Sequence, residues 1–307
     1  DGTYIQALPY SNLQFEVGVN KAYGCRFDVP LYHPLVTRDT LREALHEIWV
    51  WRNDRIVKAG PLWDVTPSSG EQKISCSSAD ILDYFDARLI GNQTFSAVDQ
   101  TAIAWGMINT SQGLTDGNLY VAQGTLGTGI TRSASWRTFD VKYILETLTD
   151  MSEMTSGFDF YIDPHTRLFH ANYPRPQRNN NLELVYPEHI KGYSVQYWGK
   201  YMRNIVNVTG VDPAIAIAVD TTSRTTYGLR EYADSYRDAA TVTDLNAYAS
   251  KIRDQRKDPK AYPTITIRDD LFNIFDTSVI QFGDLIRVII RDGYVDFNQV
   301  LRYKTAQ

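Results

Sequence analysis

The sequence contains few cysteines, no long apolar run and no excess of positive charge. Cys25 and Cys76, among 307 residues, are too few for a disulfide framework or a zinc site. We expect two buried thiols, although a single bridge between them also fits the sequence. No apolar run is long enough to span a bilayer, so we expect no stable membrane insertion. The net charge of −5 argues against a dedicated nucleic-acid binder, because phosphate contacts need a basic surface.

Sequence motifs with a known catalytic mechanism are also missing. There is no Gly-x-Ser-x-Gly elbow, no His-Glu-x-x-His helix and no distinctive pair of carboxylates, so we expect no enzymatic activity, no catalytic residues and no cofactor. The glycine-rich residues 124–129 superficially resemble a phosphate-binding loop, but they lack the flanking strand, helix and lysine. The first residue is Asp1 rather than Met, so we expect a processed or partial piece of a longer chain.

One pair of histidines has a spacing that deserves a structural test. His165 and His170 lie on opposite arms of a predicted hairpin, and Asp159 or Asp163 could supply a third metal ligand. The simpler interpretation, which we favour, is a turn histidine and an exposed strand histidine. We therefore predict no metal site.

The clearest local structure in the sequence is a hairpin over residues 47–65. Two apolar runs flank Asn53 and Asp54, which tolerate the positive φ of a tight turn. Ile48 and Val50 alternate with tryptophans, so both faces of the first strand are apolar and we expect both to be covered.

Alternating apolar residues predict further strands, and helical spacing predicts a few helices. We expect a hairpin over residues 13–29 and another over residues 158–171. Further strands are predicted at 73–76, 193–197, 205–209, 214–219, 263–267, 285–290 and 295–303. We expect helices in segments 37–46, 77–89, 96–108, 138–148 and 245–252, and irregular chain at 112–136 and 172–181.

These elements divide the sequence into three regions and predict an α+β, mainly β fold. Residues 1–76 would form a first β domain, part of a barrel that residues near 182–210 would complete. Residues 77–181 would form a helix-rich insert, and residues 182–307 a second β-barrel with one helix. In the strand at 214–219, alternate residues are alanine, which suits close packing in the core or, less favoured, against another subunit.

The order of several short motifs resembles the tail-hub or minor tail proteins of long-tailed bacteriophages (siphoviruses), the group called Gp37-like. The hairpin at residues 49–60 is one of these motifs. The others are LQFEVGVN (13–20), CRFDVP (25–30) with HPL (33–35), DIL (80–82) through RLI (88–90), GFDF (157–160), NIVNVTG (204–210), YGLRE (227–231) and FGDLIRV (282–288).

The resemblance implies a structural virion protein at the tail tip. Such proteins are similar to the trimeric baseplate hub of contractile-tailed phages, in which two tube-like β-barrel domains per chain form a ring and an inserted domain lies outside. The implied partners are two further copies of the chain, the distal tail protein or tail tube, other tail-tip or receptor-binding proteins, and the tape-measure protein. DNA would pass through the channel without sequence-specific binding.

A second hypothesis is a module that binds carbohydrate or acts on the cell wall. Exposed tryptophans can stack on sugar rings, and the candidates for such a platform are Trp49, Trp51, Trp63, Trp136 and Trp198.

Overall fold

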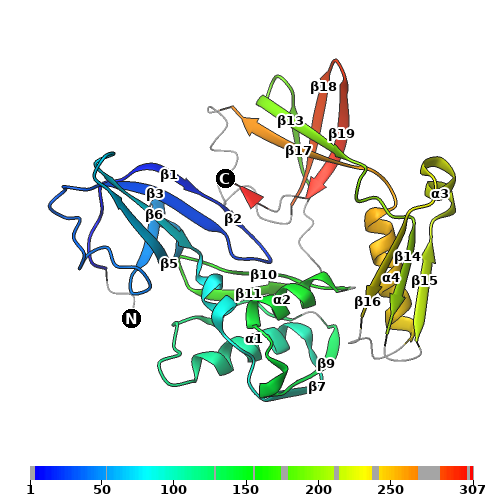
Figure 1. The fold of residues 1–307 in the computed structure, drawn as a ribbon, viewed down its shortest axis with the longest axis horizontal. Helices are drawn as coiled ribbons and strands as arrows, with labels where there is room; N and C mark the ends of the chain where they lie inside the picture. Colours follow the sequence, from blue (N-terminus) through cyan, green and yellow to red (C-terminus); the bar gives the residue numbers. More distant parts are fainter. Residues whose placement is uncertain are drawn as a thin grey trace. The chain divides into compact units, whose positions relative to one another are not determined.

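The computed structural model describes residues 4–52, 54–127, 129–154, 156–173, 179–210, 214–236, 242–268, 284–302 and 305–306. The fold is mainly β, as predicted, with short helices between the strands (Figure 1). The chain forms two compact units. Unit 1 comprises residues 1–178, 282–284 and 302–307, and unit 2 comprises residues 179–281 and 285–301.

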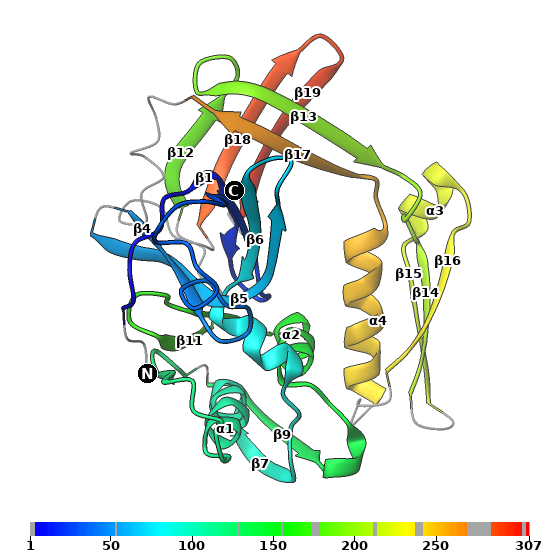
Figure 2. The same cartoon turned by 60° about the vertical axis from the view of Figure 1, so that its left-hand side comes forward.

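Unit 1 contains a five-stranded antiparallel sheet that curls into an open half-barrel (Figures 1 and 2). Its order is β1 (Ser11–Phe15), β3 (Gly24–Pro30), β6 (Lys73–Ala79), β5 (Arg55–Ser68) and β4 (Glu47–Arg52). The curl follows from β5, whose first half pairs with β4 and whose second half pairs with β6.

The predicted β4–β5 hairpin is confirmed. Asp54 has φ 60°, the left-handed conformation that an aspartate tolerates in a tight turn. Ile48 and Val50 pack on the cluster around Leu62, whereas Trp49 packs on the opposite cluster. Trp51, at the open end, is 52% exposed, so the hairpin is covered on both faces except near its turn.

The rest of unit 1 wraps one apolar core. Its largest cluster contains Phe85, Met107, Leu148, Phe160 and Phe169. The elements around it are η1 (Ile81–Ala87), β7 (Gln93–Asp99), α1 (Gln100–Gln112), β8 (Ala122–Gln123), β9 (Thr131–Trp136), η2 (Thr138–Asp140), α2 (Ile144–Glu153), β10 (Asp159–Ile162) and β11 (Leu168–Asn172).

The chain returns to unit 1 after passing through unit 2. The short strand β20 (Thr305–Ala306) pairs with β2 (Val17–Gly18). Just before it, the Arg302 guanidinium pairs with the carboxylate of Asp159, a β10 residue that is 2% exposed. Residues almost three hundred positions apart therefore complete the same unit.

A buried lysine ties the sheet of unit 1 to η1. Lys58 on β5 is 2% exposed, and its ammonium donates to the carbonyl oxygens of Tyr23 (2.6 Å) and Glu16 (3.0 Å). The third neighbour is the Asp80 carboxylate, 3.6 Å away, which also accepts from the backbone N–H groups of Tyr23 and Leu82. Burial lowers the pKa of Lys58 and raises that of Asp80, so each charge depends on the other.

The described residues of unit 2 form three small sheets and two helices. One sheet has the order β12 (Asn179–Val185), β18 (Leu285–Asp292), β19 (Val295–Arg302), and a two-stranded ribbon joins β13 (Ile190–Trp198) to β17 (Lys260–Ile267). The third sheet has the order β15 (Ile215–Val219), β14 (Ile205–Thr209), β16 (Glu231–Ser235), and the helices are α3 (Thr221–Tyr227) and α4 (Val242–Arg256).

Helix α4 covers one face of the β15–β14–β16 sheet (Figure 2). The predicted stripe of Leu245, Ala249 and Ile252 packs against Ala216 and Ala218 of β15. The alanine face therefore packs in the core, as favoured, and the small side chains let the helix approach closely. The other face of β15 carries the larger apolar residues.

The helix predicted for residues 37–46 is wrong. The described segment forms successive turns, because Ala44 has φ 58° and its N–H donates to the Leu62 carbonyl instead of continuing a helical ladder. His46 is likewise tied to β5, since its carbonyl accepts from the Leu62 N–H. Local bonds such as Leu41 N–H to the Thr37 carbonyl form single turns, but the tertiary bonds to Leu62 keep them from joining into a helix.

The predicted helix starts in unit 1 were also displaced. The helices predicted from residues 77 and 96 begin only after their capping residues Asp80 and Asp99, because Ser77 and Ser96 belong to the preceding strands. Thr138 lies in η2 and α2 begins after Tyr143. Two predicted loops contain strands: β8 and β9 lie within 112–136, and β12 begins at residue 179. Residues 174–178 of the loop predicted at 172–181 lie outside the described part. Residues 282–283 of the FGDLIRV motif also lie outside it.

Candidate interaction surfaces

One face of the β13–β17 ribbon carries an exposed row of polar and aromatic side chains, one of which is a lysine. Direct cross-strand pairs place Trp198 opposite Lys260, Gln196 opposite Tyr262, and Ser194 opposite Thr264. Paired residues in antiparallel strands point to the same side, and all six are exposed. The opposite face, with Val195 and Ile265 among others, is half-buried except at Tyr197, which is 49% exposed. The ribbon is therefore amphipathic, with its polar face open.

Aromatic rings cluster at one end of this open face. The Trp198 ring centroid lies 5.1 Å from that of Tyr262 and 5.7 Å from that of Tyr201. The three side chains are 42%, 47% and 57% exposed, respectively. The Lys200 ammonium lies 6.0 Å from the Tyr201 ring. We call Trp198, Tyr201 and Tyr262 the aromatic triad.

A second exposed surface lies on the β15–β14–β16 sheet, on the face away from α4. Ile215 and Ile217 are each 61% exposed, and Val219 is 36% exposed. Strand β15 also forms an edge of this sheet. An edge strand with an apolar open face is a surface that other strands or subunits can cover.

A third exposed surface lies on η2 and the residue after it in unit 1. Phe139 is 73% exposed, and Val141 is 59% exposed with φ 48°, an unusual conformation for a β-branched residue. The loop is held by hydrogen bonds: Asn92 Oδ1 accepts from the Thr138 N–H (2.8 Å), and Asp140 accepts from the Arg137 N–H (2.7 Å). Phe139 is thus displayed by a well-fixed loop.

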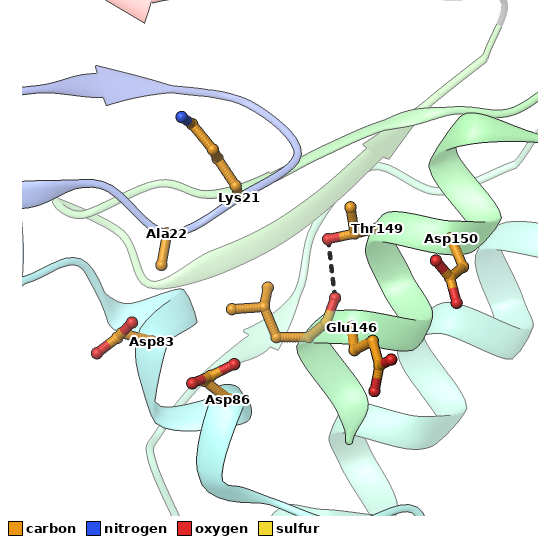
Figure 3. Close-up of a pocket in the computed structure, with 8 residues that line it drawn as sticks. Lys21, Ala22, Asp83, Asp86, Glu146, Thr149 and Asp150 are labelled. Atoms are coloured by element: carbon orange, nitrogen blue, oxygen red, sulfur yellow. Dashed lines mark hydrogen bonds between the residues drawn. The ribbon is translucent and has the colours of Figure 1, made fainter. Parts of the chain in front are cut away.

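A shallow acidic pocket lies between η1, α2 and the segment before β3 (Figure 3). Its volume is about 350 Å³. Figure 3 shows that Asp83 and Asp86 come from η1 and Glu146 and Asp150 from α2, with Lys21 on the segment before β3. The Thr149 hydroxyl donates back to the Leu145 carbonyl (2.9 Å) within α2. Asp83 also accepts from the Trp63 indole N–H, so part of the acidic charge is used within the fold.

The two candidate metal-ligating histidines have different surroundings. His165 Nδ1 accepts from the Ile56 N–H (3.4 Å), and its ring meets the edge of Trp51. His170 accepts from the Thr125 N–H (3.1 Å) and stacks on Tyr161. Burial lowers the pKa of His170. Over the described residues, no group of three or more His, Cys, Asp or Glu side chains is arranged to hold a metal ion.

The glycine-rich segment 124–129 lies against the start of α1. The Gly127 N–H donates to the Thr101 hydroxyl (2.8 Å) and the Gly129 N–H to the Asp99 carboxylate (3.0 Å). Residue 128 lies outside the described part. A carboxylate already occupies the position that an anion would take, so this loop does not have the chemistry of a phosphate site.

The structure separates the five candidate tryptophans. Trp49 and Trp136 pack against the core, and the Trp63 ring meets Tyr84 edge-on. Trp51 and Trp198 are exposed, but they lie in different units.

Cys25 and Cys76 are buried free thiols, which leaves the single bridge unformed. Burial raises the pKa of both, that of Cys76 to about 12, so they are poor nucleophiles at neutral pH.

Three solved structures of tail proteins, two of them from prophages, share this fold. The 43 kDa tail protein of prophage MuSo2 from Shewanella oneidensis is 12% identical, with a TM-score of 0.64 over 99% of this chain and 90% of that one. The tail protein from Neisseria meningitidis MC58 is 12% identical, with a TM-score of 0.67 over 95% and 85%. The prophage tail protein gp18 from Listeria monocytogenes EGD-e is 9% identical, with a TM-score of 0.60 over 96% and 84%.

These likenesses establish a fold found in phage tail proteins along almost the whole chain. At 9–12% identity these likenesses show the fold, but they do not show the role of any single residue. No protein-family model matches the chain, and no curated protein matches it in sequence. In the described part of the chain, no helix is long and apolar enough to cross a membrane.

Proposed function

We propose that the chain is a structural, non-catalytic component of a bacteriophage tail. The observation that carries this proposal is the shared fold with three tail proteins, two of them from prophages, which extends over 95–99% of the chain. A likeness of that extent is difficult to attribute to one common module inserted in an unrelated protein. The sequence resemblance to siphovirus tail-hub proteins points to the same class.

We further propose a homotrimeric hub at the tail tip, built from two tube-like β-barrel domains and an inserted domain. Residues 1–76 and 182–307 would supply the tube-like domains, and residues 77–181 the insert. The curled half-barrel of unit 1 is compatible with a barrel that is completed by further strands. In this arrangement exposed apolar surfaces, such as the outer face of β15, would become subunit contacts.

The proposed partners follow from that position in the virion. The hub would join the distal tail protein or tail tube to other tail-tip or receptor-binding proteins. Its channel would hold the tape-measure protein and then pass DNA without sequence-specific binding. A net charge of −5 suits a channel of this kind, because an excess of basic residues would hold the phosphates.

The solution mass of the purified chain tests the oligomeric state. Light scattering after size exclusion should give three times the chain mass over a range of protein concentrations. Ring-shaped particles by electron microscopy would then support a hub. A monomeric mass that persists when the purified distal tail protein is added would contradict the proposal.

A further inference from the structure

The open face of the β13–β17 ribbon has the composition of a ligand-binding surface. Stable protein interiors bury tryptophan and tyrosine, yet the aromatic triad of Trp198, Tyr201 and Tyr262 leaves 42–57% of each side chain exposed. The rings contact one another, with centroids 5.1 and 5.7 Å apart, so they form one surface rather than scattered side chains. Such a surface offers ring faces to the C–H groups of a ligand.

Neutral hydrogen-bonding groups continue the same face beyond the rings. Gln196, Ser194 and Thr264 are exposed and point to the side that carries Trp198 and Tyr262. An amide and two hydroxyl groups can each donate and accept hydrogen bonds. Aromatic rings beside such groups match a molecule that carries apolar C–H patches and hydroxyl groups together, which is the chemistry of a sugar ring.

Two lysines give the surface a positive charge. Lys260 lies directly opposite Trp198, and the Lys200 ammonium is 6.0 Å from the Tyr201 ring. Neither ammonium has an ion-pair partner among the residues that the structure describes. No carboxylate lies among the six cross-strand residues, although the whole chain carries a net charge of −5. The charge therefore favours an anionic ligand.

We propose that the aromatic triad, with Lys200 and Lys260, binds an acidic glycan. The rings would stack on the sugar, the neutral polar row would bond its hydroxyl groups, and the lysines would pair with its carboxylate or phosphate groups. A nucleic acid fits less well, because two lysines offer little charge against one phosphate per nucleotide and the neighbouring rings are tilted by 53° rather than parallel. This site is independent of the proposed hub.

Isothermal titration of the full chain with hexagalacturonate, an oligomer of uronic acid, tests the site. Binding should be measurable at low salt, and maltohexaose, a neutral glucan, should bind at least about tenfold more weakly. Trp198→Ala should weaken the binding of hexagalacturonate about tenfold, as expected for the loss of a stacked ring. The double change Lys200→Ala/Lys260→Ala should weaken it similarly and reduce its salt dependence.

The matched control is Trp51→Ala, which removes a tryptophan of similar exposure (52%) from unit 1 and should leave binding unchanged. The proposal is overturned by four results: no binding of hexagalacturonate, equal binding of maltohexaose, tighter binding of oligothymidylate, or equal weakening by Trp51→Ala. Light scattering of the Trp198→Ala variant adds a further check. A change of oligomeric state would identify the triad as a subunit contact and would also overturn the proposal.

Discussion

Lys58 joins three segments of unit 1 from inside the protein. Its ammonium is satisfied by the carbonyl oxygens of Glu16 and Tyr23 and by the Asp80 carboxylate. Replacement by methionine keeps most of the side-chain volume but leaves these acceptors, including the Asp80 carboxylate with 22% of its side chain exposed, without their cation. Removal of one partner from a buried ion pair generally costs about 3–5 kcal/mol.

We therefore expect Lys58→Met to lower the free energy of unfolding of unit 1 by about 3–5 kcal/mol. Urea denaturation followed by circular dichroism measures the change. The control is Lys21→Met, at an exposed position, which should change the stability by less than about 0.5 kcal/mol. Equal effects of the two variants would show that the buried network does not stabilise the fold.

The pH dependence of stability should report the pairing of Glu47 with Arg167. The Arg167 guanidinium donates to the Glu47 carboxylate at 2.8 and 3.2 Å. Burial alone would raise the pKa of Glu47, but the hydrogen bonds and charge of Arg167 outweigh it and lower the pKa. The stabilisation is then complete above the unfolded pKa of about 4.3 and is lost as the pH falls through the lower folded value.

Glu47→Gln should accordingly destabilise the protein by about 2 kcal/mol at pH 7, because it replaces charge-assisted hydrogen bonds with neutral ones. The difference from wild type should shrink as the pH is lowered below about 4. Denaturation at several pH values measures it. Glu71→Gln, at an exposed carboxylate that pairs with Lys73, should be nearly neutral. A pH-independent deficit for Glu47→Gln would rule out this account.

At the scale of single elements, the position of β5 depends on the close approach of its Gly60 backbone to the backbone of Ala79 at the end of β6. A Cβ atom at Gly60 would lie 2.2 Å from the Ala79 carbonyl oxygen, where no side chain fits. Gly60 also pairs with Ile48 across the β4–β5 hairpin, so the strand cannot move away without loss of its pairing. The glycine thus lets the hairpin lie against the end of β6.

Gly60→Ala should lower the stability by about 3 kcal/mol or prevent folding, since overpacking here meets rigid backbone. The matched control is Gly70→Ala, in the β5–β6 turn, where a Cβ atom would meet nothing within 4 Å. Thermal melts of both variants provide the comparison. A Gly60→Ala variant as stable as Gly70→Ala would mean that the strand shifts freely.

Elements with strong local patterns were predicted well from sequence. The hairpins around Asp54 and residues 163–166 are confirmed, as are β14, β18 and the stripe of α4, because turn chemistry and periodicity agree in each. Strand β16 was missed, because its parallel pairing with β14 has no local signal. The helix at 37–46 failed for the converse reason, since hydrogen bonds to Leu62 override the local pattern.

The candidate surfaces were less predictable than the strands. A period of two shows that Trp198 and Tyr197 point to opposite faces, but not which face other elements cover. Five tryptophans were equal candidates in the sequence, and packing of Trp49, Trp63 and Trp136 removed three of them. The exposure of Phe139 and Val141 was unexpected, because their segment carries the pattern of a buried helix start.

At the scale of the whole molecule, the chain crosses from unit 1 to unit 2 and comes back. The charge of Asp159 is neutralised by Arg302, a residue 143 positions away. Arg302→Gln should leave a buried carboxylate short of its cation and lower the stability of unit 1 by about 3 kcal/mol. Amide hydrogen exchange on β10 should register the loss.

The control for that change is Arg291→Gln, at an arginine on β18 of unit 2 whose side chain is 72% exposed. It should alter hydrogen exchange very little, because exposed ion pairs contribute little to stability. Equal exchange rates on β10 in both variants would show that Arg302 is dispensable for unit 1.

The return of the chain to unit 1 also sets the order of events during synthesis. Strand β2 cannot gain its β20 partner, and Asp159 cannot gain Arg302, until the ribosome has made residues 302–306. Unit 2 lies earlier in the chain than these residues and can fold first. A nascent chain that pauses before residue 302 should therefore hold unit 1 incomplete, with the edge of β2 open to chaperones or to neighbouring chains.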